Sequence, residues 1–476
     1  MNKIAVIGCG NVGFTIIYGL MTLNTNLEVT IIDNDKEKIL SNISDLNHSL
    51  SITKVKLGDY EDLNQCETIV ITAGIKPISN RTKFLKESYK MINIIMENIN
   101  KTKFNGNIIV VSNPNDVLTT YVSKNYLYPN KVIGTGTMLD QNRLKYYLSE
   151  KYQVNPNEVQ GMVIGEHGKC QKVLWNTIKI KNIEISLLEE EKKIIEEKVI
   201  NIANEIVKKK GYTNYGIASC VINILEKILN NETFKLIGSF YNKELGISYS
   251  YPLLCKDKEF SYDCDYNFDI NFCVSKIKHE YFIFQNNKVI GIDLDDTITN
   301  IQEEMKKYAA IFDKENNGKG IVDVNKYLVG EMYGWTDELK DKFFLTYRRK
   351  IIKEAKIRKN VSKIFHKWQG LGYKIVIITA RNSRYYNNPY QDTYAYLVKH
   401  HVPFDELIVN VGLKKDICLK YKVDYFVDDM PNNCMQVNEI ENIKVFIMDN
   451  GNNYCDDKNI IRIKNFEDMD KVINDV

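Results

Sequence analysis

Two groups of residues in this sequence have the types and spacing that are typical of catalytic or ligand-binding sites. In one group, the stretch NKVIGIDLDDTITN (287–300) places Asp293, Asp295 and Thr297 directly after an apolar run that is typical of a buried strand. The other members of this group follow later apolar runs and comprise Thr379, Lys414, Lys415, Asp428 and Asp429. Because the carboxyl ends of parallel strands meet at one edge of a sheet, we expect these residues to converge.

The chemistry that this acidic group suits is phosphoryl transfer. A carboxylate nucleophile needs its own charge and that of the phosphate neutralised, which Mg²⁺ achieves by bridging their oxygens. A second carboxyl group two residues further along is able to protonate the leaving oxygen and later to activate water. A lysine and a threonine hydroxyl then hold the phosphate oxygens. Each motif alone also fits a purely structural role at a strand end, so the prediction depends on their combination.

The second group lies in the first half of the sequence and begins with a glycine-rich turn. GCGNVG places Gly8, Gly10 and Gly13 between a predicted strand and a predicted helix. Glycines there allow a tight turn and a close approach of a pyrophosphate to the backbone, and the helix N-terminus attracts the phosphates. Asp33 ends the next strand, where a carboxylate accepts the ribose hydroxyls of NAD. The pattern predicts an NAD site.

Residues suited to the reduction of a carboxylated substrate come later in this half. GTGTMLDQNR supplies Asp140 and Arg143, and GEHGKC supplies His167. A histidine is able to donate a proton, and a neighbouring carboxylate raises its pKa. An arginine binds a carboxylate through two parallel hydrogen bonds, which a lysine does poorly. The three residues therefore offer a proton donor, a group that keeps it charged and an anchor for the substrate.

These stretches, together with SDLNH, ITAG, SNPNDVL and KGYTNYG, resemble the NAD-dependent L-lactate/malate dehydrogenase family from residue 1 to about 254. The resemblance implies that His167 protonates the ketone oxygen while NADH delivers hydride. It also implies that Asp140 holds the imidazole in its charged form and that Arg143 clamps the substrate carboxylate. The family forms dimers or tetramers, so a homo-oligomer is expected.

The resemblance assigns three further residues to the substrate end. Arg81 would polarise the carbonyl, Asn113 would orient substrate and nicotinamide, and Thr213 would line the pocket. The segment IKPISN before Arg81 is shorter than in the family, and no residue matches the position that discriminates lactate from malate chemistry. Lys76 in this segment either faces a second substrate carboxylate or is a solvated lysine. The expected substrate is a small 2-oxo or 2-hydroxy acid, either pyruvate/lactate-like or malate-like.

The acidic group resembles the haloacid dehalogenase superfamily over about 288–476, and more narrowly its 5′-nucleotidase-like phosphatases. The resemblance implies that Asp293 becomes an aspartyl-phosphate and that Asp295 is the general acid and base. It implies a Mg²⁺ ion held by Asp293, Asp428 and the backbone carbonyl of Asp295, with Asp429 assisting. The substrate would be a phosphomonoester, for example a nucleotide.

Two other features of this half follow from the same resemblance. Thr379 and either Lys414 or Lys415, with Lys414 preferred, would bind the phosphoryl group. Helices from about 300 to 370 would form a cap that excludes water and selects the substrate. The cap sequences KYLVGEMYGW and FFLTYRRK contain aromatic and cationic residues. These either grip a base or sugar or form the core and surface of a small helical bundle.

The elements that must position these residues indicate an α/β protein. Strands alternate with helices in both halves, which predicts parallel, doubly wound sheets. A charged helix is expected over 188–210 and a hairpin near 234–254, whereas 255–286 shows no clear period and is interpreted as irregular chain that forms the end of the second lobe and a linker. The predicted domains are a Rossmann NAD-binding domain (1–144), an α+β substrate domain with linker (145–286) and a haloacid dehalogenase-like Rossmannoid domain with a helical cap (287–476).

The composition bears on which classes of partner and which location are expected. The net charge is only +3 among 26% charged residues, which gives no electrostatic reason to expect nucleic acid or a membrane surface as a partner. The ten cysteines form no CxxC pair, which favours reduced thiols and a cytoplasmic location. No apolar run approaches the roughly 20 residues that a membrane span requires.

The leading hypothesis is a bifunctional enzyme that joins an NAD-dependent L-2-hydroxyacid dehydrogenase to a Mg²⁺-dependent phosphomonoesterase. The alternative is that the dehydrogenase half is a non-catalytic NAD-binding or oligomerisation scaffold, because its discriminating segment is shortened. A third hypothesis is that the phosphatase removes a phosphorylated side product related to the hydroxy acid of the first half.

Overall fold

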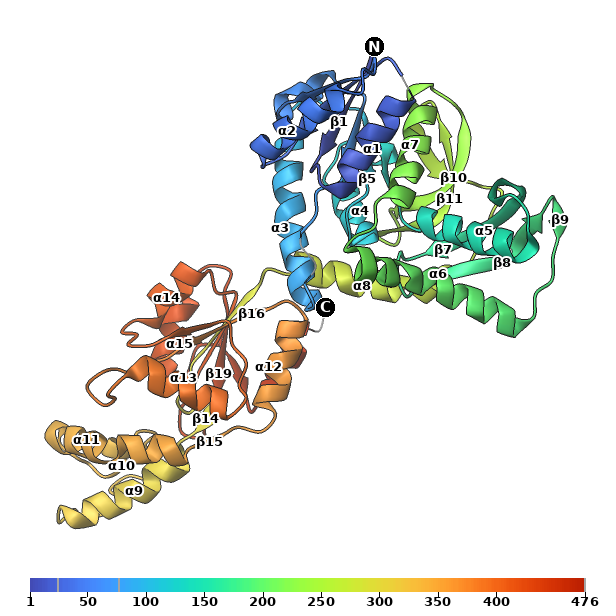
Figure 1. The fold of residues 1–476 in the computed structure, drawn as a ribbon. Coiled ribbons are helices and arrows are strands. Elements are labelled where there is room, and N and C mark those ends of the chain that lie inside the picture. The colour runs from blue at the N-terminus through green and yellow to red at the C-terminus, as the bar shows by residue number, and fades with distance from the viewer. Residues whose placement is uncertain (24, 76–77, 475–476) are drawn as a thin grey trace. The chain divides into compact units, whose positions relative to one another are not determined.

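The computed structural model describes residues 1–23, 25–75 and 78–474, and the chain divides into two compact units, Met1–Gln285 and Asn286–Val476 (Figure 1). Within the described residues, none of the helices combines the length and the apolar character that crossing a membrane would demand.

The first unit opens with a parallel sheet in the strand order β3-β2-β1-β4-β5-β6. Except for β3, these strands are buried over most of their length, because both faces of the sheet are covered by helices. The strands are β1 (Asn2–Ile7), β2 (Leu27–Ile32), β3 (Lys54–Leu57), β4 (Thr68–Ile71), β5 (Asn107–Val110) and β6 (Val132–Gly134). The helices between them are α1 (Asn11–Thr22), α2 (Lys36–Asn47), α3 (Arg81–Ile99) and α4 (Asn115–Lys124). This is the doubly wound arrangement that the alternation predicts.

The same sheet continues into antiparallel strands of a second lobe, in the order β10-β11-β7-β8-β9 after β6. Its elements are α5 (Met138–Tyr152), β7 (Val159–Gly165), β8 (Gln171–Ile180), β9 (Ile183–Glu184), α6 (Glu189–Lys210), α7 (Tyr215–Leu229), β10 (Phe234–Asn242), β11 (Ile247–Lys256) and β12 (Glu259–Tyr262). The predicted charged helix is α6, and the predicted hairpin is the antiparallel pair β10 and β11, so both predictions are confirmed.

The segment 255–286 is not irregular, and this prediction is wrong. It contains the end of β11, strand β12 and the helix α8 (Asn271–Gln285). This helix buries Cys273, Ile277 and Phe284. Apolar residues also lie on its exposed face, such as Phe282, and they hide the helical period in the sequence.

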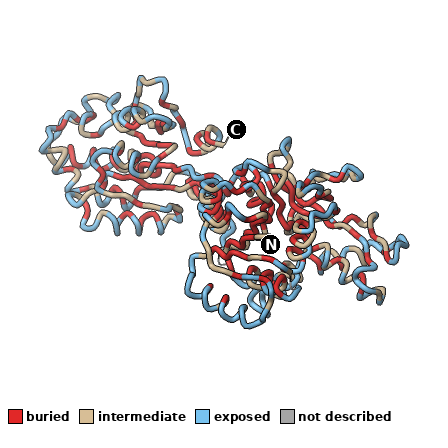
Figure 2. Tube along the Cα trace, turned by 90° about the horizontal axis from the view of Figure 1, so that it is seen from above, coloured by how far each residue is buried: buried red, intermediate tan, exposed pale blue. Residues whose placement is uncertain are grey.

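The second unit is built on a parallel sheet in the order β17-β16-β13-β18-β19-β20. Apolar clusters cover both of its faces, and in Figure 2 the buried residues follow the strands through the interior of each unit. The strands are β13 (Val289–Ile292), β16 (Lys374–Ile378), β17 (Glu406–Ile408), β18 (Tyr425–Asp428), β19 (Lys444–Met448) and β20 (Ile461–Ile463). The helices are α12 (Val361–Gly370), α13 (Pro389–Lys399), α14 (Lys414–Tyr421), α15 (Pro431–Asn438) and α16 (Phe466–Asn474).

A helical insert interrupts this unit after β13. It comprises α9 (Gln302–Glu315), α10 (Val329–Met332) and α11 (Asp337–Glu354), and the short antiparallel strands β14 (Thr299–Asn300) and β15 (Lys356–Ile357) close its base (Figure 1). Phe312 and Phe343 lie in a core of its own. The predicted cap over 300–370 is therefore too long at its C-terminal end, because α12 packs Phe365 and Trp368 onto the sheet instead.

Two candidate active sites

A groove of about 780 Å³ lies at the carboxyl ends of β1 and β2, between strand and helix as the glycine-rich turn predicts. Gly8 has φ +83°, and a Cβ there would lie 2.2 Å from the Cα of Ala73, so only glycine fits. A Cβ on Gly13 would lie 2.9 Å from the hydroxyl oxygen of Thr72, whereas Gly10 borders open space. The turn is therefore tight on one side and open on the other, as a bound pyrophosphate requires.

Asp33 follows β2 and lines this groove. Its carboxylate accepts hydrogen bonds from the backbone N–H groups of Cys9 (2.6 Å) and Asp35 (3.0 Å), which fix it at the groove wall. Helix α1 begins at Asn11 without a capping side chain among the described residues. The charge, the glycines and the uncapped helix end together fit a dinucleotide. Thr213 lies in the lining of this groove and not in that of the pocket around His167.

His167, Asp140 and Arg143 come together as one hydrogen-bonded group. Nδ1 of His167 lies 2.6 Å from Oδ2 of Asp140, and Nη1 of Arg143 donates to Oδ1 of the same carboxylate at 2.7 Å. Asp140 and Arg143 are one turn apart on α5, and His167 is in the loop after β7. Asp140 is buried, so its charge acts on its two neighbours with little screening.

The electrostatics of this group favour a charged imidazole. Burial alone would lower the pKa of His167, but the carboxylates of Asp140 and Asp116 outweigh burial and hold the pKa above its ordinary value. Burial alone would raise the pKa of Asp140, but His167 and Arg143 outweigh it and hold that pKa below its ordinary value. Each partner therefore favours the ionised form of the other.

Asp116 belongs to the same site and was not predicted from the sequence. Its Oδ2 accepts the backbone N–H of His167 at 2.8 Å, and its Oδ1 accepts the hydroxyl of Ser239 at 2.6 Å. Burial raises the pKa of Asp116 to about 6, against the opposing effect of those two hydrogen bonds. The motif SNPNDVL, from which Asn113 was selected, contains Asp116 three residues later.

A pocket of about 220 Å³ opens beside His167 and is also lined by Asn113 and Arg81. Arg81 is the first residue of α3, and its guanidinium donates to both carboxylate oxygens of Glu280 on α8, with Nε 3.1 Å from Oε1. Glu280 also lines the pocket and was not predicted. Arg143 is not in this lining, and Lys76 lies outside the described residues.

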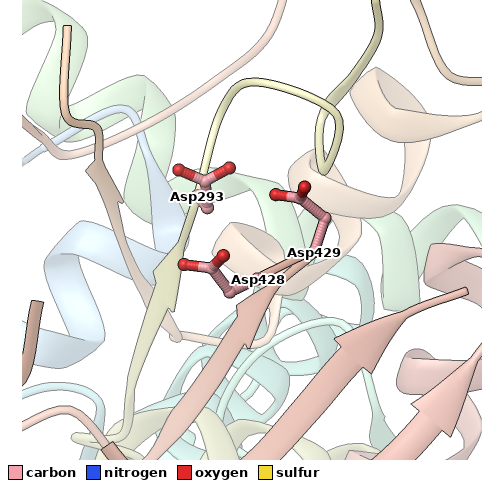
Figure 3. A group of neighbouring side chains, drawn as sticks. All are labelled: Asp293, Asp428 and Asp429. Atoms are coloured by element: carbon pink, nitrogen blue, oxygen red, sulfur yellow. The ribbon is translucent and has the colours of Figure 1, made fainter. Parts of the chain in front are cut away.

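The second candidate site lies in the second unit, at the ends of β13 and β18. Carboxylate oxygens of Asp293, Asp428 and Asp429 all lie within 4.8 Å of one another, and Figure 3 shows the three side chains converging above the two strand ends. Nζ of Lys414, at the start of α14, contacts both Asp293 and Asp428, the latter at 2.6 Å. Lys415 instead pairs with Glu439 at the surface. The structure therefore brings Lys414, and not Lys415, into the acidic group.

Burial dominates the charges in this group. It raises the pKa of Asp293 to about 7, with Lys414 opposing the shift and Asp428 adding to it. Burial and the neighbouring carboxylates also raise the pKa of Asp429 well above its ordinary value. The three buried carboxyl groups are accompanied by one ammonium group, that of Lys414, which pairs with Asp293 and Asp428. Because all the donors are oxygens, the group fits a hard cation such as Mg²⁺.

The carboxylate of Asp295 is directed to two arginines instead of the acidic group. Nη2 of Arg381 and Nη2 of Arg348 both contact it, the latter at 2.8 Å. Burial alone would raise the pKa of Asp295, but the two guanidinium groups outweigh it and lower the pKa to about 2. Asp429, which was predicted to assist, lies in the carboxylate cluster with Asp293 and Asp428. The predicted role of the Asp295 backbone carbonyl as a metal ligand stays a prediction.

Thr379 and the two arginines complete the surroundings. Thr379 is buried at the end of β16 and lines the same cavity as Asp293. Arg381, two residues later, lines the same cavity. Arg348 comes from the insert sequence FFLTYRRK, where sequence reasoning left its role open between substrate contact and surface.

Comparison with known proteins identifies the first unit. Residues 2–134 match the lactate/malate dehydrogenase NAD-binding domain, and residues 137–264 match the lactate/malate dehydrogenase alpha/beta C-terminal domain. An L-lactate dehydrogenase of Clostridium perfringens is 36% identical over 269 residues, which cover 52% of this chain and 84% of that protein. One from Macrococcus caseolyticus is 37% identical over 260 residues, 52% of this chain and 82% of that protein.

A solved structure of an L-lactate dehydrogenase is also similar to the first unit. The L-lactate dehydrogenase from Clostridium thermocellum is 32% identical, with a TM-score of 0.54 over 60% of this chain and 100% of that one. Through residues 2–264, the chain belongs to the lactate/malate dehydrogenase family.

Proposed function

We propose that the first unit reduces a 2-oxo acid to the L-2-hydroxy acid with NADH, and that pyruvate is its substrate. The observation that carries the proposal is the shared carboxylate of Asp140, which contacts both His167 and Arg143. The relatives described above are L-lactate dehydrogenases, which favours the pyruvate/lactate pair over the malate pair.

Each residue of the site has its own role in the proposed reduction. Asp140 occupies Nδ1 of His167, which leaves Nε2 to donate a proton to the ketone oxygen. NADH, when bound, supplies the hydride. Arg143 would bind the substrate carboxylate, although in this structure it pairs with Asp140 and does not line the pocket. Asn113 and Arg81 would orient and polarise the carbonyl. Arg81 must leave Glu280 to do so.

The test is oxidation of NADH, followed by its absorbance, with pyruvate, oxaloacetate and bulkier 2-oxo acids, in the wild type and in His167→Asn. Turnover with one acid that the substitution abolishes supports the proposal. Retained NADH binding without any turnover would instead support the scaffold hypothesis.

We further propose that the second unit is a phosphomonoesterase of the haloacid dehalogenase type. The observation that supports it is the convergence of Asp293, Asp428 and Asp429 with Lys414 at the strand ends. Asp293, Asp428 and Asp429 would hold Mg²⁺, which neutralises phosphate charge when bound. The helical insert with α11 would close over the site.

The proposed reaction proceeds in two displacements. An oxygen of Asp293 attacks phosphorus, the bond from phosphorus to the ester oxygen breaks, and the ester oxygen takes a proton and leaves as an alcohol. Water then attacks the aspartyl-phosphate, which restores Asp293 and releases inorganic phosphate. Asp295 would carry the proton in both steps, which requires that its arginines release it. Hydrolysis of p-nitrophenyl phosphate with Mg²⁺, abolished in Asp293→Asn, tests this activity.

A further inference from the structure

A cavity of about 370 Å³ lies between the acidic group and the helical insert of the second unit. Its walls combine the proposed catalytic residues Asp293 and Asp295 with apolar side chains of the insert, among them Met305 and Phe344. Two arginines, Arg348 and Arg381, also line it. This inference concerns what those arginines bind, and it rests on the proposed phosphomonoesterase activity.

Arg381 has its donors committed within the protein. Its side chain is fully buried, its Nε and Nη2 both donate to Asp295, and its Nη1 lies 3.4 Å from the hydroxyl of Thr393. A buried guanidinium needs an anion nearby, and Asp295 supplies it. Arg381 alone therefore balances the charge of Asp295.

Arg348 is a second positive charge on the same carboxylate. It comes from α11 of the insert, donates through Nη2 to Asp295, and has its Nε 3.4 Å from the hydroxyl of Tyr386. Within the described part of the chain, its Nη1 makes no hydrogen bond. The side chain is 17% exposed and borders the cavity. Arg348 thus has unused donors next to the space that a substrate would fill, and it binds a carboxylate that Arg381 already pairs.

We infer that the cavity accepts a phosphomonoester with a carboxylate close to the ester oxygen, and that Arg348 binds this carboxylate. The proton carrier Asp295 must lie beside the ester oxygen, and Arg348 contacts Asp295 directly. An anion bound by Arg348 is therefore only a few atoms from phosphorus. Arginine binds carboxylates through paired N–H donors, so a carboxylate fits this position.

A phosphorylated 2-hydroxy acid has this arrangement, because its carboxylate is attached to the carbon that carries the ester oxygen. A nucleoside monophosphate has no second anion there. Met305 and Phe344 offer an apolar wall for a short alkyl group. The inferred substrate class is also the phosphorylated form of the acids that the first unit is proposed to make.

The test compares two esters that differ only in the carboxylate, with a nucleotide as a third substrate. With the full-length chain and Mg²⁺, kcat/KM is measured for 2-phospholactate, for isopropyl phosphate, in which a methyl group replaces the carboxylate, and for AMP. We expect the wild type to prefer 2-phospholactate over isopropyl phosphate by roughly 10- to 100-fold, the usual effect of charged hydrogen bonds. Arg348→Gln should reduce this ratio to near one, and Arg348→Lys should restore part of it.

Arg349→Gln is the matched control. Arg349 is the next residue of α11, is exposed, and hydrogen-bonds to Asn387 outside the cavity lining. It should leave the ratio unchanged.

A binding measurement separates the inference from the activity on which it rests. Calorimetry compares 3-phosphonopropionate, which has a carboxylate and cannot be hydrolysed, with propylphosphonate in the wild type and in Arg348→Gln. Tighter binding of the carboxylated compound that depends on Arg348 supports the inference even if no ester is hydrolysed, an outcome that removes only the proposed activity. Hydrolysis without preference for the carboxylate, preference for AMP, or an equal loss on all esters in Arg348→Gln would overturn the inference and leave the phosphomonoesterase in place.

Discussion

Nδ1 of His167 lies 2.6 Å from Oδ2 of Asp140, and this contact joins a loop of the second lobe to helix α5. The contact both selects the ring nitrogen that faces the substrate and raises the pKa of His167. The proton that the reduction consumes is therefore present on His167 to a higher pH than in a free histidine.

Asp140→Asn tests this coupling. Reduction requires protonated His167, so activity is lost as pH rises through the raised pKa of His167. Without the carboxylate that pKa falls, and the loss should begin at lower pH. We also expect kcat to fall on the order of 100-fold, since general acid catalysis contributes at least that much. The pH dependence of kcat for NADH oxidation is the measurement. An unchanged profile would show that Asp140 does not control the protonation of His167.

The ion pair between Arg81 and Glu280 leads to a second prediction. Arg81 is half-exposed, so the pair contributes about 0–1 kcal/mol and competes with the substrate by that amount. Glu280→Gln should free Arg81 and lower the KM for the 2-oxo acid by up to roughly fivefold. Glu87→Gln, which removes a surface pair with Lys90 on the same helix α3, is the control and should have no effect. A higher KM in Glu280→Gln would mean that Glu280 positions Arg81 productively.

The sequence predicted the doubly wound arrangement of both sheets, because apolar runs followed by glycines or carboxylates identify strand ends in such a fold. Strands β3, β6, β19 and β20 were not predicted. His167 and Asp140 were paired from their motifs and from the family resemblance that these motifs carry. The pair Arg81 and Glu280 was not, because 199 residues separate them and only the packing of α8 against α3 brings them together. The contact of Arg348 with Asp295 likewise depends on how the insert packs onto the sheet.

The predicted C-terminal end of the cap was wrong because the pattern of a helix does not show which core the helix packs against. Helix α12 has the apolar stripe of any surface helix, and the sequence does not distinguish packing on the insert from packing on the sheet. Asp116 was missed for a different reason. Its role is to accept a backbone N–H of His167, and no residue type in the sequence signals such a partner.

Divalent cations should stabilise the second unit. The carboxylates of Asp293, Asp428 and Asp429 lie close together, and Lys414 pairs with the first two, so a bound Mg²⁺ relieves the repulsion among the three. At a concentration 100 times its Kd, Mg²⁺ should add about 2.7 kcal/mol to the free energy of unfolding. Thermal unfolding with and without MgCl₂ measures this, and Asp429→Asn should reduce the gain. Asp456→Asn, at an exposed acidic residue of the same unit, should retain it. Equal gains in both variants would place the cation elsewhere.

The neighbouring residues Lys414 and Lys415 differ in burial, so their substitution should affect stability differently. Lys414 is buried between Asp293 and Asp428, whereas Lys415 forms an ion pair with Glu439 at the surface. In the absence of Mg²⁺, Lys414→Met leaves two buried carboxylates unpaired, which should cost about 3–5 kcal/mol of unfolding free energy. Lys415→Met should cost about 0–1 kcal/mol.

The same two variants distinguish an effect on stability from an effect on phosphate hydrolysis. If Lys414 also holds the phosphoryl group, Lys414→Met should abolish hydrolysis of p-nitrophenyl phosphate even when saturating Mg²⁺ restores its stability, whereas Lys415→Met should hydrolyse it at the wild-type rate. NADH oxidation by the first unit, measured in the same samples, reports whether the rest of the chain is intact. Full hydrolysis by a refolded Lys414→Met protein would confine Lys414 to the structural task of balancing Asp293 and Asp428.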